Sequence, residues 1–157
     1  MRKIIILLAA LVFIVSLSGC DKEEPRYSID EIMTVEMPKE AKLVNEAEAK
    51  DDEGNTVVND RTYLAKGGTY IWFSVTNPSK DYGEFVKEIS AVKEVHGNNT
   101  FYVNENPTNK NLERVVWIGK EGKKGVIQCD FSSASEKGFT DKELKMYEDI
   151  MSSITLE

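Results

Sequence analysis

The chain has 157 residues, of which 41% are hydrophobic and 30% are charged, and its formal net charge is −7 at pH 7. This acidity argues against a nucleic-acid-binding protein, which needs a basic surface for the phosphate backbone. The one histidine in the sequence excludes a metal centre built from several histidines, so we expect no cofactor or metal site.

The chain begins with an export signal. Arg2 and Lys3 precede an uninterrupted apolar run over residues 4–15. As a helix this run would be about 18 Å long, well short of the roughly 30 Å hydrocarbon core of a bilayer. A positive start followed by a short apolar run predicts a secretory signal peptide rather than a membrane-spanning helix.

The apolar run ends in the sequence Leu17-Ser18-Gly19-Cys20. These four residues resemble the lipobox of bacterial lipoproteins. The resemblance implies that residues 1–19 are removed, that Leu17, Ser18 and Gly19 are recognition positions, and that the Cys20 thiol is lipidated. It also implies a protein held by its lipid on the extracytoplasmic face of the cell membrane. The alternatives are a conventional signal peptide with an incidental cysteine and an uncleaved anchor.

A short tether is predicted next. Residues 20–28 are rich in charge, contain Pro25 and show no apolar period, which is typical of a linker. A single globular domain is then predicted over residues 29–157. Residues 21–60 hold thirteen Asp and Glu against five Lys and Arg, an excess that an anionic membrane should repel modestly.

The globular domain is predicted to be α+β, with a mostly antiparallel, meandering sheet packed against a C-terminal amphipathic helix. The clearest strand is residues 69–76, where Ile71, Phe73 and Val75 alternate with more polar positions. A short helix is predicted over residues 84–89. Gly, Asn and Asp between the other runs predict hairpins, with strands over residues 32–37, 41–49, 56–65, 90–95, 100–103, 112–119 and 125–131.

The last helix has the strongest local signals. Thr140 followed by Glu143 matches a capping box, which predicts a helix of about fourteen residues starting there. Phe139 and the residue four positions into the helix are placed to form a hydrophobic staple. One apolar face is predicted to cover the sheet, comprising Leu144, Tyr147, Ile150, Met151 and Ile154.

Residues 95–154 contain "VHGNNTFYV", "VVWIGKEG" and this final helix. In these features the chain resembles the PsbP and Mog1 type of module, and also a small domain of unknown function common on bacterial lipoproteins and sporulation proteins. No catalytic motif accompanies either resemblance. The resemblance to the PsbP and Mog1 modules implies a binding or adaptor domain.

Three aromatic residues, Tyr70, Trp72 and Trp117, are candidates for a binding face for sugars or peptides, with core packing as the alternative. His96 is predicted to be an exposed turn residue, and Cys129 to be buried in a strand. A calcium loop of the EF-hand type fails at residues 51–55, because Ala49 stands where the first aspartate is required.

These patterns predict a non-catalytic binding or accessory lipoprotein. It would be attached to the membrane through the lipid on Cys20 and would recognise an envelope protein or a small ligand. Two alternatives are an extracytoplasmic enzyme that uses carboxylates and a regulatory or inhibitory lipoprotein that acts on a membrane partner.

Overall fold

The computed structural model describes residues 26–29, 32–50, 54, 56–104 and 112–157. In chain order, the elements are β1 (Arg26–Ile29), β2 (Met33–Glu36), β3 (Lys42–Lys50), β4 (Thr56–Leu64), β5 (Tyr70–Val75), α1 (Tyr82–Glu88), β6 (Ala91–His96), β7 (Asn99–Asn104), β8 (Glu113–Ile118), β9 (Ile127–Ser132), α2 (Asp141–Ser153) and β10 (Thr155–Leu156). The predicted signal peptide and the residues that resemble a lipobox lie outside the described residues.

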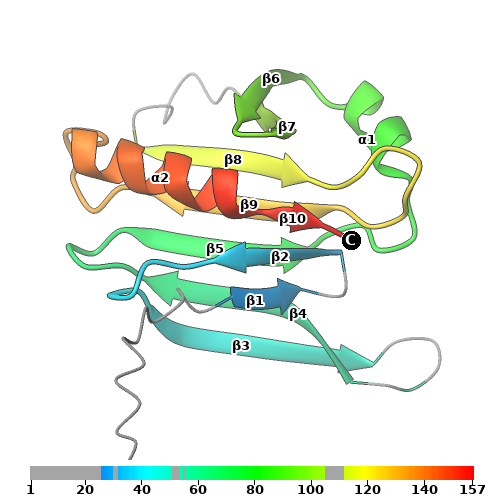
Figure 1. The fold of residues 1–157 in the computed structure, drawn as a ribbon, viewed down its shortest axis with the longest axis horizontal. Helices are drawn as coiled ribbons and strands as arrows, with labels where there is room; N and C mark the ends of the chain where they lie inside the picture. The colour runs from blue at the N-terminus through cyan, green and yellow to red at the C-terminus, as the bar shows by residue number, and fades with distance from the viewer. Residues whose placement is uncertain (1–25, 30–31, 51–53, 55, 105–111) are drawn as a thin grey trace, which may run out of the picture.

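The strands form two antiparallel sheets (Figure 1). The large sheet has the order β3-β4-β5-β9-β8-β7-β6, and the small sheet has the order β1-β2-β10. Figure 1 shows α2 and the small sheet covering the same face of the large sheet, which we call the inner face. The predicted α+β architecture, with a C-terminal helix packed on a mostly antiparallel sheet, is confirmed.

The core lies between the inner face, α2 and the small sheet. In β5, Ile71 and Phe73 are fully buried, as the alternation predicted. Phe73 lies opposite Cys129 of β9, which is also fully buried, as predicted. Burial, and then the charge of Asp130, raises the pKa of the Cys129 thiol, so the thiol is held in its unreactive form. The same core takes in Met33 of the small sheet.

The predicted tether is too long at its C-terminal end, because Arg26–Ile29 forms β1 and pairs with β2. The first predicted strand is confirmed as β2, but it belongs to the small sheet rather than the large one. Its other neighbour is β10, with Met33 opposite Leu156. This pairing joins segments more than a hundred residues apart, so no local pattern could predict it.

Helix α2 begins with the predicted capping box. The Thr140 hydroxyl accepts a hydrogen bond from the Glu143 N–H at 3.3 Å, and the Glu143 carboxylate accepts one from the Thr140 N–H at 2.8 Å. The prediction of which α2 residues cover the sheet is wrong at one position, since Leu144 is 38% exposed. Phe139 packs against Phe131, with ring centroids 5.7 Å apart.

Gly125 lies shortly before β9, and its missing side chain lets Ile32, the residue before β2, pack close to the backbone. It has φ +106°, and an added Cβ would lie 2.5 Å from Cδ1 of Ile32. Gly122 in the same connection has φ +76° but open space around its Cβ position. We expect Gly125→Ala to lower the free energy of unfolding by about 2 kcal/mol and Gly122→Ala by about 1 kcal/mol, because only the first adds a clash to the backbone strain. Urea unfolding of both variants measures this; equal losses would contradict it.

Candidate functional site

The side of the large sheet opposite α2, which we call the outer face, holds the candidate aromatic residues. Residues directly opposite each other in neighbouring antiparallel strands point to the same side. Trp72 pairs in this way with Thr62 on β4 and Asp130 on β9. Across the four central strands, the outer-face positions in these pairings are Asp60, Thr62, Leu64, Tyr70, Trp72, Ser74, Glu113, Val115, Trp117, Gln128, Asp130 and Ser132. These twelve positions include three carboxylates and no Lys or Arg.

Trp72 is half-buried at the centre of this face. Its indole N–H donates a 2.6 Å hydrogen bond to Asp60 Oδ1, which fixes the orientation of the ring. Tyr70 precedes it by two residues on the same side of β5 and is 45% exposed. An oriented aromatic ring among polar groups can stack on a sugar ring or on a cation.

Trp117 lies on the same face, with β9 between its strand and that of Trp72. Its ring packs edge-on against Phe85 of α1, with centroids 5.1 Å apart. Tyr82 of α1 donates a 2.8 Å hydrogen bond to the Trp117 carbonyl. The structure therefore leaves Tyr70 and Trp72 open on β5 and places Trp117 against the short helix.

Asp130 is the electrostatically unusual carboxylate of the outer face. Burial raises its pKa, and the charge of Glu113 raises it further, whereas the hydrogen bond from Gln128 lowers it. Gln128 Nε2 donates that bond to Asp130 Oδ1 at 2.9 Å. A raised pKa favours pairing with a positive group or an O–H donor from a ligand. A carboxyl group that acts as a general acid also needs a raised pKa. Asp130, however, lies on the sheet face, opposite Val115.

A second polar cluster lies at the inner edge of the large sheet, which we call the Glu94 cluster. Glu94 of β6 accepts hydrogen bonds from Arg114 at 2.9 Å and from the Tyr147 hydroxyl at 3.0 Å. The His96 Nε2 lies 3.0 Å from the same carboxylate, and its Nδ1 lies 2.6 Å from Glu148 of α2. The cluster ties β6, β8 and α2 together.

The prediction that His96 is an exposed turn residue is wrong. The residue is 4% exposed, and it pairs with Asn99 while the two-residue turn lies between them. Alternation along β6 sets His96 on the same side of the strand as Glu94. Each ring nitrogen lies within hydrogen-bonding distance of a carboxylate, Nε2 of Glu94 and Nδ1 of Glu148. The carboxylate of Glu94 and both ring nitrogens of His96 have partners within this cluster, and we interpret the cluster as structural.

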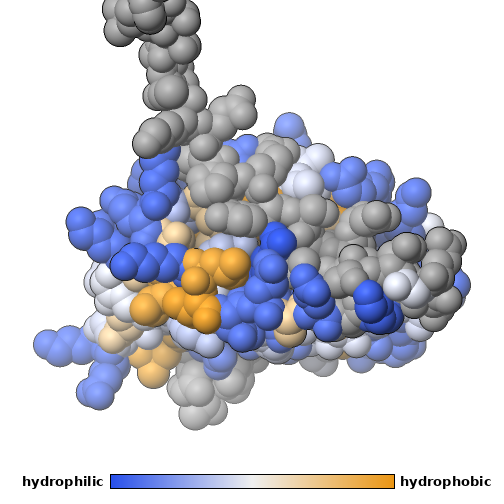
Figure 2. Space-filling view, turned by 90° about the horizontal axis from the view of Figure 1, so that it is seen from below, coloured by the Kyte–Doolittle hydropathy of each residue, from blue (hydrophilic) through white to orange (hydrophobic). Residues whose placement is uncertain are grey.

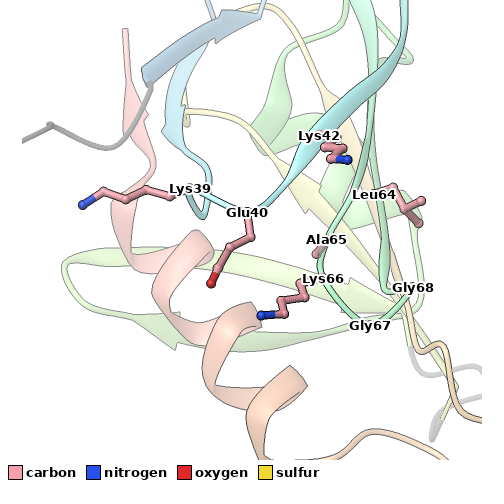
Figure 3. Close-up of a pocket in the computed structure, with 8 residues that line it drawn as sticks. All are labelled: Lys39, Glu40, Lys42, Leu64, Ala65, Lys66, Gly67 and Gly68. Atoms are coloured by element: carbon pink, nitrogen blue, oxygen red, sulfur yellow. The ribbon is translucent and has the colours of Figure 1, made fainter.

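A third feature is a hollow of about 470 Å³ between the β2–β3 loop and the β4–β5 turn. Figure 3 shows its lining side chains, with the lysines pointing outward in different directions rather than converging on one point. The lining residues are Lys39, Glu40, Lys42, Leu64, Ala65, Lys66, Gly67 and Gly68. The hollow was not predicted, because its residues come from two segments that become neighbours only through the pairing of β3 with β4.

Over the residues that the structure describes, no group of three or more His, Cys, Asp or Glu side chains is placed to hold a metal ion. Within the same residues, neither helix has the length and hydrophobicity needed to cross a bilayer.

Comparisons with known proteins bear on the fold alone. No family model matches the sequence, and no curated protein matches it. The fold is similar to that of a protein from Bacteroides thetaiotaomicron VPI-5482 solved by crystallography, with a TM-score of 0.52 and 12% sequence identity. The match covers 86% of this chain and 49% of the other, so this chain spans about half the length of that neighbour.

Proposed function

We propose that the protein is a lipid-anchored, non-catalytic binding or accessory lipoprotein on the extracytoplasmic face of a cell membrane. The observation that carries this proposal is the sequence Leu17-Ser18-Gly19-Cys20 at the end of a short apolar run. The thiol of Cys20 would carry the lipid, and the domain from Arg26 onward would present the recognition surface.

The outer face supports the binding part of the proposal. It holds a half-buried Trp72 fixed by Asp60, an exposed Tyr70 and an Asp130 with a raised pKa. Aromatic area with a few oriented polar groups is the usual composition of a recognition surface. The partner would be an envelope protein or a small ligand that contacts this face.

Replacing Cys20 tests the anchor. Cells expressing the full chain are fed a clickable fatty acid, and the protein is isolated and assayed for label. We expect Cys20→Ala to lose the label and to leave the membrane lipoprotein fraction, because the thiol that accepts the lipid is gone. Cys129→Ala is the matched control and should keep both, since Cys129 is fully buried in the core. Equal labelling of Cys20→Ala and the unaltered chain would overturn the proposal.

The binding part is tested by cross-linking and pull-down from solubilised membranes with the unaltered chain and with Trp72→Ala. Loss of a partner with Trp72→Ala supports recognition by the outer face. Retention of the same partner places recognition elsewhere on the domain. The free energy of unfolding of Trp72→Ala, measured beside it, distinguishes lost recognition from lost folding.

A further inference from the structure

The point where the chain enters the domain fixes which end of it is nearest to the lipid. Strand β1 begins at Arg26, which pairs with Glu36, three residues before Lys39. Only residues 21–25 separate Cys20 from β1. Even fully extended, this stretch reaches about 20 Å. If Cys20 is lipidated, as proposed above, the end of the domain around Lys39 stays close to the membrane surface.

That end of the domain is basic, although the chain as a whole is acidic. Lys39, Lys42 and Lys66 are exposed around the hollow, and Glu40 is the acidic residue in its lining. The outward spread of the lysines in Figure 3 suits many separate anionic groups better than one small anion held at the centre. A layer of phospholipid headgroups presents negative charge in that way.

Apolar side chains are exposed beside these lysines. Leu43 and Val44 are 43% and 53% exposed on the edge strand β3, and Leu64 is 39% exposed. Leu64 pairs with Lys42, so apolar and basic groups are direct neighbours. Figure 2, which views this edge of the molecule, shows apolar side chains gathered among hydrophilic ones. Basic groups next to a few exposed aliphatic side chains are the combination that binds a membrane interface.

An acidic stretch of the sequence follows the other end of β3, at Lys50. This strand is nine residues long, so its two ends, Lys42 and Lys50, lie about 27 Å apart. Asp51, Asp52 and Glu53 follow Lys50 in the sequence, outside the described residues. Contact with the membrane through Lys42 therefore keeps the start of this acidic segment away from the anionic surface.

We propose that the surface formed by Lys39, Lys42, Leu43, Val44, Leu64 and Lys66, which we call the lysine end, lies against the anionic phospholipid headgroups of the membrane that holds Cys20. This inference rests on the proposed lipid anchor. It orients the domain, with the lysine end toward the membrane and the connection between β8 and β9 away from it.

Lysine acylation in proteoliposomes tests the orientation. Lipidated protein is reconstituted into vesicles of phosphatidylcholine alone or with phosphatidylglycerol, and each lysine is followed by mass spectrometry. We expect labelling of Lys39, Lys42 and Lys66 to slow by about fivefold in the anionic vesicles, and high salt to restore it. Lys123, exposed between β8 and β9, should react equally in both.

Variants give the test a matched control. With Lys42→Glu and Lys66→Glu combined, Lys39 should lose its protection, whereas Lys123→Glu combined with Lys124→Glu should leave it unchanged. Equal labelling of Lys39 in neutral and anionic vesicles, with the protein still vesicle-bound, would overturn the orientation and leave the anchor intact. Protection by dissolved inorganic phosphate on neutral vesicles would also overturn it, by showing a small-anion pocket. Failure to float with any vesicle would instead overturn the anchor.

Discussion

Replacing Glu143 with glutamine should lower the free energy of unfolding by about 3 kcal/mol at neutral pH. The carboxylate is 7% exposed and accepts hydrogen bonds from several segments at once. The Thr69 hydroxyl and the Ala134 N–H donate to Oε1, at 2.9 and 3.1 Å. The N–H and hydroxyl of Thr140 donate to Oε2, at 2.8 and 2.9 Å. A glutamine would place an NH₂ group against one pair of these donors.

The same contacts predict an acid-dependent stability. Burial alone would raise the pKa of Glu143, but the hydrogen bonds from Thr140, Thr69 and Ala134 outweigh it and lower the pKa to about 2 from its usual value near 4.5. Because the folded-state pKa is depressed, this contribution is complete above about pH 4.5 and is lost as the pH falls toward 2. A shift of this size corresponds to about 3 kcal/mol.

Urea unfolding of the unaltered chain and Glu143→Gln between pH 7 and pH 2 measures both effects. The difference between the two proteins should be largest at neutral pH and should shrink below pH 4.5. Glu136→Gln, on an exposed residue of the loop that precedes α2, should behave like the unaltered chain. A difference that stays constant down to pH 2 would contradict the hydrogen-bonding account.

Replacing Glu94 with glutamine should cost a similar amount, about 2 to 3 kcal/mol. The substitution keeps the shape but removes the charge that Arg114 pairs with, and it sets an NH₂ group against other donors. Those donors include the Tyr147 hydroxyl, whose pKa is raised by burial and then by the charge of Glu94. Breaking a partly buried ion pair from one side leaves the other charge uncompensated. Thermal and urea unfolding measure the loss.

A double-mutant cycle assigns the loss to the cluster. Glu94→Gln and Tyr147→Phe should couple by about 1 kcal/mol, because each removes one partner of the same 3.0 Å hydrogen bond. Glu88→Gln is the matched control: its ion pair with Lys80 is exposed on α1, so its loss should be below about 0.5 kcal/mol. Additive losses within the cycle would show that Glu94 acts independently of α2.

Local patterns in the sequence predicted the elements of this fold other than β1 and β10. The alternation around Phe73 predicted β5, and the spacing of Thr140 and Glu143 predicted where α2 starts. Both signals depend only on residues near one another in the chain, so no tertiary information was needed. The burial of Cys129 followed from the same alternation within one strand.

The sequence did not predict which distant strands and side chains would contact one another. Charged Arg26 suggested a tether because its pairing with Glu36 is not visible in the residues around it. His96 suggested a turn because its two carboxylate partners include Glu148, which is fifty-two residues away. Trp72 and Trp117 could both be placed on strands, but the cover that α1 gives to Trp117 depends on how the chain crosses between β5 and β6.

The pairing of β10 with β2 also determines when the small sheet can be completed during folding. Strand β2 is completed by Thr155 and Leu156, so its second neighbour is synthesised more than a hundred residues after it. During synthesis, or during passage through a narrow channel, β2 can pair with β1 alone, and an isolated hairpin of this size is marginal in water. Met33 and Val35 would then be exposed until the C-terminal residues emerge. Closure of the small sheet is therefore a late event, and removal of β10 should leave its open edge available to other chains.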